Sequence, residues 1–168
     1  MKLALETLLT LQQESLLQRF AIGGAIAASF YVEAVATEDL DVFAFITPQP
    51  SGFVLLTPLY DRIKALGGRV HNEHIVIGNW PVQILPAFNP LVEAAVLSAP
   101  LQRFEGIEIP VIAADYLAAI ALQLGRAKDY LRVDALIASG ACQIDSLNDL
   151  IASHQLHDRW ASYVRRMA

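Results

Sequence analysis

The first third of the chain alternates between helical and strand-like hydrophobic patterns. Over residues 3–18, leucines recur at helical spacing with polar residues between them, which predicts an amphipathic helix. The apolar run 20–22 predicts a short strand that ends in a Gly-Gly turn, and the alanine-rich segment 25–32 predicts a second helix. Residues 39–46 begin with alternating polar and apolar positions and then become fully apolar, as a buried strand does.

The remaining pattern predicts one more strand cluster followed by helices. The predicted elements are a helix at 55–66, strands at 74–77 and 82–85, a helix at 90–97, two strand-like pieces within 102–112, and helices at 114–124, 126–139, 146–153 and 156–167. This order predicts an α+β fold in which helices flank a mixed β-sheet. We expect a single domain over residues 1–168, with a helical C-terminal portion at about 113–168.

Composition adds an expectation about the surface. Apolar residues make up 55% of the chain, charged residues 17%, and the mean hydropathy is +0.42, so the apolar content exceeds that of an ordinary globular chain. No apolar stretch is long enough to cross a bilayer, which argues against a membrane partner. We therefore expect a large core together with a self-association surface, and hence a homodimer.

Charge and cysteine content bear on partners and location. The net charge of −5 argues against broad, nonspecific nucleic-acid binding, although Arg159, Arg165 and Arg166 leave room for a local basic patch. The single cysteine has no partner for an internal disulfide. Polar residues also interrupt the N-terminal apolar run, as they would not in a signal peptide. A cytoplasmic protein is expected.

Asp39 and Asp41 are the first candidates for chemistry. Residues at i and i+2 of a strand point to the same face, which these acids share with Phe43 and Phe45. Two neighbouring carboxylates repel each other, and burial raises the cost of both charges. A divalent cation such as Mg²⁺ removes both costs and binds one or two carboxylates together with substrate phosphates. The alternative interpretation is a pair of solvated acids at the start of a strand.

The Gly23-Gly24 turn strengthens the first interpretation. Without Cβ atoms the backbone can approach a phosphate closely, and a helix that follows offers free N–H groups. Taken alone, the pair is more typical of an ordinary tight turn. A glycine turn, one helix and an Asp-x-Asp strand in succession point to a phosphate site beside a metal site.

Two stretches resemble a known superfamily. Residues 20–25 and 36–43, with the glycine turn and the Asp-x-Asp strand, resemble the polymerase-β-like nucleotidyltransferases, and within them the small bacterial domains related to AbiE-type toxins. The segment Gly125-Arg126-Ala127-Lys128-Asp129 is similar to a Gly-Arg-x-Lys-Asp segment of those domains. The two matches together span residues 20 to about 137.

The resemblance implies Mg²⁺-dependent transfer of a nucleotidyl group from an NTP to an acceptor. The acceptor would be a protein hydroxyl, an RNA end or a small molecule, and the partner an antitoxin. The resemblance implies that Asp39 and Asp41 are metal ligands. It implies that the catalytic residues are Asp39, Asp41, Lys128 and Asp129. It also implies that Gly23, Gly24, Thr37 and Arg126 bind the nucleotide. For the segment 126–129, a solvated helix face with local ion pairs is an equal alternative.

The chain departs from the superfamily pattern at three positions. Gln83 stands where a third carboxylate is usual, Ala121 where a lysine is common, and Val35 where a basic residue is often found. The third carboxylate commonly helps to deprotonate the attacking hydroxyl, and a glutamine cannot do this. The competing hypothesis is therefore a catalytically degenerate nucleotide-binding or protein-interaction domain with the same fold.

Overall fold

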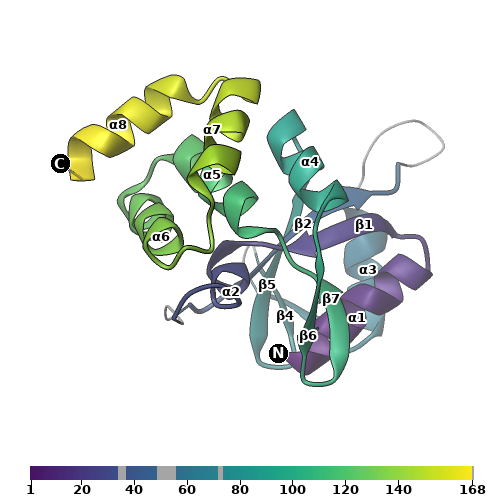
Figure 1. Cartoon of the computed structure of the whole chain (residues 1–168). Coiled ribbons are helices and arrows are strands. Elements are labelled where there is room, and N and C mark those ends of the chain that lie inside the picture. Colours follow the sequence, from purple (N-terminus) through teal and green to yellow (C-terminus); the bar gives the residue numbers. More distant parts are fainter. Residues whose placement is uncertain (34–36, 49–55, 72–73, 168) are drawn as a thin grey trace.

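The centre of the molecule is a mixed five-stranded β-sheet (Figure 1). The computed structural model describes residues 1–33, 37–48, 56–71 and 74–167. The strands lie in the order β1-β2-β5-β4-β3. Their bounds are β1 Leu17–Ile22, β2 Leu40–Ile46, β3 Arg69–His71, β4 His74–Ile77 and β5 Trp80–Pro86.

Strand β2 is the strand that positions the candidate site. It pairs antiparallel with β1 on one side and parallel with β5 on the other, whereas β5, β4 and β3 pair antiparallel in turn. Leu40, Val42 and Ala44 of β2 are fully buried, as expected for a strand in the interior of a sheet. In the parallel β2–β5 pair, Asp41 is the register partner of Gln83.

Helices pack on this sheet through apolar faces. Helix α1 (Lys2–Gln13) buries Leu5, Leu8 and Leu11 and contacts β1, β4 and α3 (Thr57–Ala65). Helix α4 (Pro90–Leu97) packs on β1 and β2, and the Asn89 side chain caps its N-terminus by accepting a hydrogen bond from the Val92 N–H at 2.9 Å.

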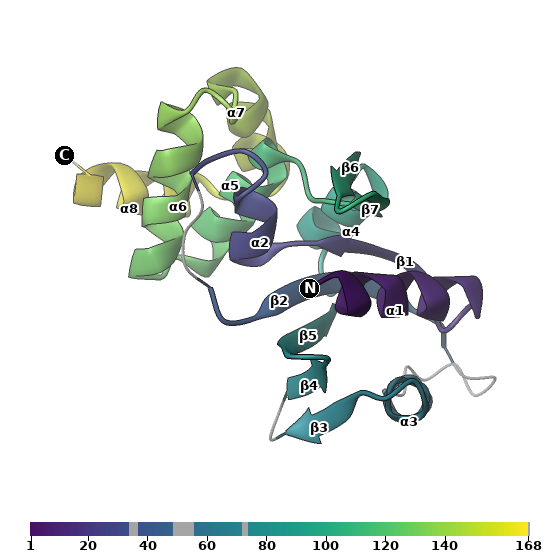
Figure 2. The same ribbon diagram turned by 90° about the horizontal axis from the view of Figure 1, so that it is seen from below.

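The C-terminal portion is helical and gathers beside α2 (Gly24–Ala28), as Figure 2 shows. A two-stranded hairpin, β6 (Leu101–Phe104) and β7 (Ile107–Pro110), leads into α5 (Ala114–Leu124). The remaining helices are α6 (Ala127–Ala138), α7 (Ile144–Ser153) and α8 (His157–Met167).

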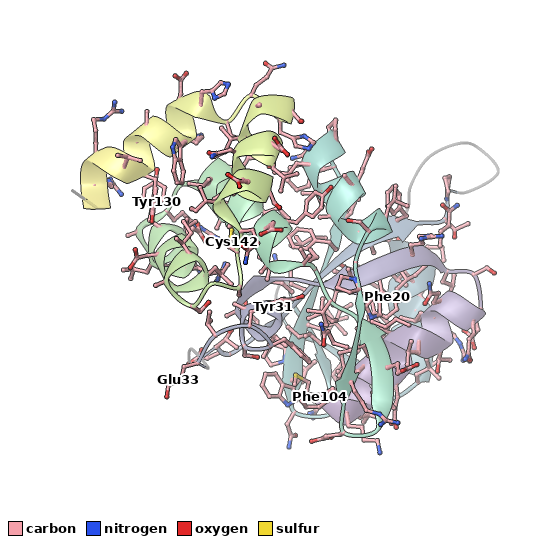
Figure 3. All side chains as sticks on the ribbon, in the orientation of Figure 1. Phe20, Tyr31, Glu33, Phe104, Tyr130 and Cys142 are labelled. Atoms are coloured by element: carbon pink, nitrogen blue, oxygen red, sulfur yellow. The ribbon has the colours of Figure 1, made fainter. Side chains whose placement is uncertain are left out.

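Helix α5 is the centre of this portion, because it is buried along most of its length and contacts α2, α4, α6, α7 and α8. Tyr130 and Cys142 lie among the side chains of these helices, apart from Phe20 in the sheet region (Figure 3). Among the described residues, none of the helices combines the length and the apolar character needed to span a membrane.

The predicted α+β fold, with its mixed sheet and helical C-terminal portion, is confirmed, but several boundaries were wrong. The first helix ends at Gln13 instead of residue 18, because Ser15 has φ +60° and Leu17 already belongs to β1. Helix α2 has only five residues rather than the eight of segment 25–32. Strand β3 was not predicted, because its three residues include a single aliphatic one. Residue 55, the expected start of the third helix, and Val35 and Ala36 fall outside the described residues.

Candidate functional site

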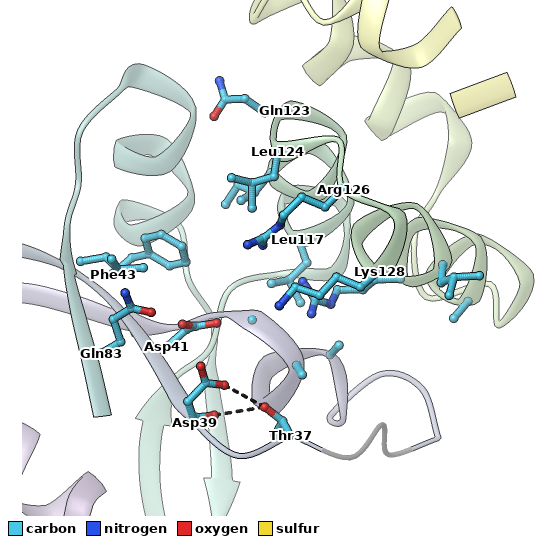
Figure 4. Close-up of a pocket in the computed structure, with 18 of the residues that line it drawn as sticks. Thr37, Asp39, Asp41, Phe43, Gln83, Leu117, Gln123, Leu124, Arg126 and Lys128 are labelled. Carbon is cyan, nitrogen blue, oxygen red and sulfur yellow. Dashed lines mark hydrogen bonds between the residues drawn. The ribbon is translucent and has the colours of Figure 1, made fainter. Parts of the chain in front are cut away.

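A cavity of about 630 Å³ lies between the sheet and the C-terminal helices (Figure 4). The polar side chains of its sheet side are Thr37, Asp39, Asp41 and Gln83. Its helix side carries Arg126, Lys128 and Arg132 from the start and first half of α6. Apolar side chains complete the lining, among them Phe43, Leu85, Phe88, Leu117, Leu124 and Leu131. Segments that are far apart in the sequence thus place acids and cations around one space.

Asp41 lies directly against Gly24, the first residue of α2. A Cβ atom at position 24 would lie 2.9 Å from Cγ of Asp41 and nearer still to its Oδ2, so only glycine leaves room for the carboxylate. Gly24 also has φ +59°, a backbone conformation that strains other residues. The glycine was expected to let a phosphate approach; the structure shows that it accommodates the carboxylate of Asp41.

The charge of Asp41 is poorly compensated within the folded chain. Its side chain is half-buried, and no hydrogen bond from the described residues reaches the carboxylate. Burial raises the pKa of Asp41 above its ordinary value, and the charge of Asp39 raises it further, whereas Arg132, Lys128 and Arg126 act in the opposite direction. A cation bound at this carboxylate would relieve both unfavourable effects.

Asp39 is held by its neighbour Thr37. The hydroxyl of Thr37 donates a hydrogen bond to Oδ1 of Asp39 at 3.0 Å and lies 3.3 Å from the Asp39 carbonyl oxygen (Figure 4). Both residues line the cavity together with Asp41, so the two acids open onto the same space. Thr37 was predicted to bind nucleotide, and its hydroxyl is here engaged in orienting an acid.

Gly23 is separated from the cavity by its packing. A Cβ atom there would lie 2.6 Å from Cδ2 of Phe43, so the aromatic ring fits against the glycine backbone. Its N–H donates to the carbonyl oxygen of Asp41 at 2.9 Å, which continues the pairing of β1 with β2. Gly23 is not among the cavity-lining residues, and this contact with Phe43 accounts for the absence of a side chain.

Gln83 lies beside Asp41 on the neighbouring strand and faces the cavity. Within the described ranges, no three His, Cys, Asp or Glu side chains come together as a candidate metal cluster. Two carboxylates with a neutral amide in the third place still fit Mg²⁺, which binds one or two carboxylates and takes its other ligands from phosphate and water. These residues therefore allow a Mg²⁺ site in which the substrate completes the set of metal ligands.

Helix α6 begins with a buried acid that binds two arginines. Asp129 is fully buried and accepts hydrogen bonds from Nε of Arg126 at 2.6 Å, from Nη2 of Arg126 at 3.2 Å and from its backbone N–H at 3.3 Å. Nη1 of Arg132 lies 3.5 Å from Oδ1 of Asp129, the oxygen that also accepts from Nη2 of Arg126. Arg126 and Lys128 extend from α6 toward the side of the cavity where Asp41 and Asp39 lie (Figure 4). Asp129 itself does not line the cavity.

Some residues of the site were missed by the sequence analysis, and one position considered there lies elsewhere. Arg132 lines the cavity, but its position six residues after Arg126 resembles an ordinary solvated helix face in the sequence. Phe88 and Leu131 are each 65% exposed at the cavity and carried no signal beyond their apolar character. Ala121 is buried inside α5 and is not part of the lining.

Cys142, the single cysteine, is buried among the C-terminal helices. Burial raises the pKa of its thiol to about 12, with a further contribution from Asp115. A thiol is nucleophilic only as the thiolate, so Cys142 is unsuited to covalent catalysis at neutral pH.

Comparison with known proteins bears on the fold. No protein-family model matches the chain, and no curated protein matches it. Among solved structures, the chain is similar to the antibiotic-resistance factor ANT(2'')-Ia, with 18% identity, a TM-score of 0.54, and 99% of this chain and 96% of that chain covered. It is also similar to an antigenic nucleotidyltransferase-like protein from Paracoccidioides brasiliensis, with 12% identity, a TM-score of 0.56, and coverage of 95% and 89%. The chain therefore has a nucleotidyltransferase-like fold.

Proposed function

We propose that this protein is a Mg²⁺-dependent nucleotidyltransferase that transfers a nucleotidyl group from an NTP to a hydroxyl of its acceptor. The observation that carries the proposal is the cavity, which Asp39 and Asp41 enter from the sheet and three cationic side chains enter from α6. Carboxylates at one side suit a divalent cation, and guanidinium and ammonium groups at the other suit the phosphates that accompany it.

The polar residues around the cavity, together with Gly24, have roles that follow from their contacts. Asp39 and Asp41 would hold Mg²⁺, Thr37 orients Asp39, and Gly24 leaves space for Asp41. Arg126 and Lys128 would bind phosphate oxygens at the opposite wall. When bound, the metal neutralises the charge of the phosphates in the transition state of an in-line displacement.

The transfer step forms one bond and breaks another. The acceptor oxygen attacks the α-phosphorus, the bond between the α-phosphorus and the bridging oxygen breaks, and pyrophosphate and the hydroxyl proton are released. Gln83 can hydrogen-bond the acceptor hydroxyl from its place beside Asp41, but its amide cannot take the proton. We therefore expect slower transfer than a third carboxylate would support.

The resemblance to AbiE-type domains favours a role as a toxin with a cognate antitoxin, and the acceptor would then be a protein hydroxyl, an RNA end or a small molecule. A second candidate function is nucleotide binding or protein interaction without catalysis. Gln83 favours this second function, because the superfamily places a carboxylate there.

Calorimetric titration and a transfer assay test the proposal. The folded chain is titrated with each NTP in the presence of Mg²⁺, and labelled NTP is then incubated with cell extract. Wild type should bind at least one NTP and label an acceptor, and Asp41→Asn should lower the transfer rate roughly 10³-fold, since several kcal/mol of charge stabilisation depend on the metal. Asp61→Asn, the same change at an exposed acid of α3, is the matched control and should leave transfer unchanged.

The possible results separate the candidates. Binding of an NTP without any transfer would favour the non-catalytic function. The absence of NTP binding with Mg²⁺ would contradict both candidates that involve a nucleotide. Transfer that persists in Asp41→Asn would refute the assigned role of the strand acids.

A further inference from the structure

The α6 wall of the cavity contains a cation that the motif comparison did not include. Arg132 lines the cavity with Arg126 and Lys128, and only 18% of its side chain is exposed. All three cations line the same cavity as the strand acids Asp39 and Asp41, so they can face a ligand that these acids share. Arg132 thus has a more enclosed place at the cavity than Arg126, whose side chain is 55% exposed.

The two arginines share one buried anchor. Arg126 lies three positions before Asp129 and Arg132 lies three positions after it, and both guanidinium groups reach its carboxylate. Its carboxylate neutralises one of the three cations, so the wall retains an excess of positive charge. That excess faces the two acids of the sheet across the cavity.

The geometry suits a polyphosphate better than a single anion. Guanidinium groups bind phosphate oxygens through planar, paired N–H donors, and each arginine has donors left after its contacts with Asp129. A guanidinium that is tied to a buried acid loses less conformational freedom on binding than a free side chain does. Two such groups and Lys128 on one wall can bind successive phosphates of one chain.

We propose that Arg132 is a further ligand-binding residue that contacts the phosphates together with Arg126, and that buried Asp129 is the positioning residue that holds both guanidinium groups at the cavity wall. The identification of the phosphates as those of an NTP rests on the proposed function. The polyphosphate site itself depends only on the α6 wall and does not require Mg²⁺.

Inorganic tripolyphosphate, titrated into the full chain in EDTA, tests the site without a metal or a nucleobase. Wild type should bind it, and Arg132→Gln should weaken binding about 10- to 100-fold, the loss expected for hydrogen bonds between charged partners. Arg132→Lys, which keeps the charge but not the paired donors, should give a smaller loss. Arg103→Gln, at an exposed position of β6 outside the cavity, is the matched control and should bind as wild type does.

Asp129→Asn distinguishes positioning from simple electrostatics. The substitution removes a negative charge from the wall, so Coulomb attraction alone would strengthen tripolyphosphate binding. Positioning predicts the opposite, a weakening of about tenfold, because both arginines lose the charged carboxylate that orients them and an amide offers a single, weaker acceptor oxygen. The measurement is made at a temperature where circular dichroism shows the variant fully folded. If Asp129→Asn does not fold, a comparison of Arg126→Gln, Arg132→Gln and their double variant decides whether the arginines act on one ligand.

The outcomes for this inference and for the proposed function are separable. Absence of tripolyphosphate binding, or binding by Arg132→Gln as tight as that of wild type, overturns the inference whatever the transfer assay gives. Tighter binding by Asp129→Asn overturns the positioning role. Tripolyphosphate binding that requires Arg132 in a protein with no nucleotidyl transfer upholds the inference while the proposed catalytic function fails.

Discussion

Asp41 and Asp129 are two acids of the same region that the fold treats in opposite ways. Asp129, on α6, is fully buried, receives donors from Arg126 and lies beside Arg132. Asp41, on β2, is half-buried next to a second acid, and the described residues supply no hydrogen bond to its carboxylate. One carboxylate has hydrogen-bond donors within the chain, whereas the other receives none from the described residues.

The difference separates a structural acid from a candidate functional acid. Several donors offset the desolvation cost of a buried charge, whereas a buried charge without them lowers stability until a ligand binds. Functional sites commonly lower the stability of a protein, because they retain groups that a maximally stable protein would replace. Substitutions at the two acids and at Gly24 test whether the acids differ in this way.

Gly24→Ala should have the largest effect on stability. The new Cβ would overlap the Asp41 carboxylate and occupy a residue with φ +59°, so we expect the free energy of unfolding to fall by about 2–4 kcal/mol. Mg²⁺ binding should be lost at the same time, because the carboxylate is displaced. Urea denaturation and calorimetry measure the two effects.

Gly140→Ala is the matched control for this change. Gly140 has φ +73° with no atom within 4 Å of a new Cβ, so alanine there meets backbone strain alone and should cost only about 1–2 kcal/mol. An equal loss in both variants would show that Asp41 is not the group that Gly24 accommodates.

Asp129→Asn should lower the free energy of unfolding by about 1.5–3 kcal/mol, since it weakens hydrogen bonds between charged groups around a buried position. Asp149→Asn, at an exposed acid of α7, should change it by less than about 0.5 kcal/mol. Chemical denaturation of both variants gives the comparison. A neutral result for Asp129→Asn would remove the contrast between the two acids.

Asp41→Asn should have the smallest effect and the opposite sign. Because burial and Asp39 raise the pKa of Asp41 in the folded protein, the folded state binds its proton more tightly than the unfolded state. Wild type therefore loses stability as pH rises from the ordinary value of 3.8 through the higher folded pKa. Asparagine does not titrate, so Asp41→Asn does not lose stability over this pH range. At neutral pH the variant should be more stable than wild type by less than about 1 kcal/mol, and below pH 3.8 it should be no more stable than wild type. Thermal melts over this pH range measure it, and lower stability of the variant at neutral pH would contradict the pKa argument.

The sequence pattern predicted the sheet side of the cavity better than the helix side. Asp39 and Asp41 were expected on one face because side chains alternate along a strand, and Gln83 was expected near them from the resemblance to the superfamily; the parallel pairing of β2 with β5 came only from the structure. The role of Gly24 was not predictable, because it depends on contact with Asp41, which is distant in the sequence.

The helix side depended on tertiary burial that local pattern does not encode. Asp129 resembles any acid in the first turn of a helix, and only packing shows that it is fully enclosed. Arg132 likewise resembles a solvated cation until α6 is placed over the cavity. Leu16 and Leu17 fit both a helix and a strand, and the turn at Ser15 decides between them.

The arrangement of the cavity also has a consequence for the order of events during synthesis. The five strands of the sheet are complete at Pro86, whereas the cationic wall is supplied by α6, which begins at Ala127. A chain that leaves the ribosome N-terminus first can pair its strands while the opposite wall is still being translated. The proposed polyphosphate site would therefore be incomplete in a nascent chain until its later helices have docked, and binding of the ligand would follow the last step of assembly.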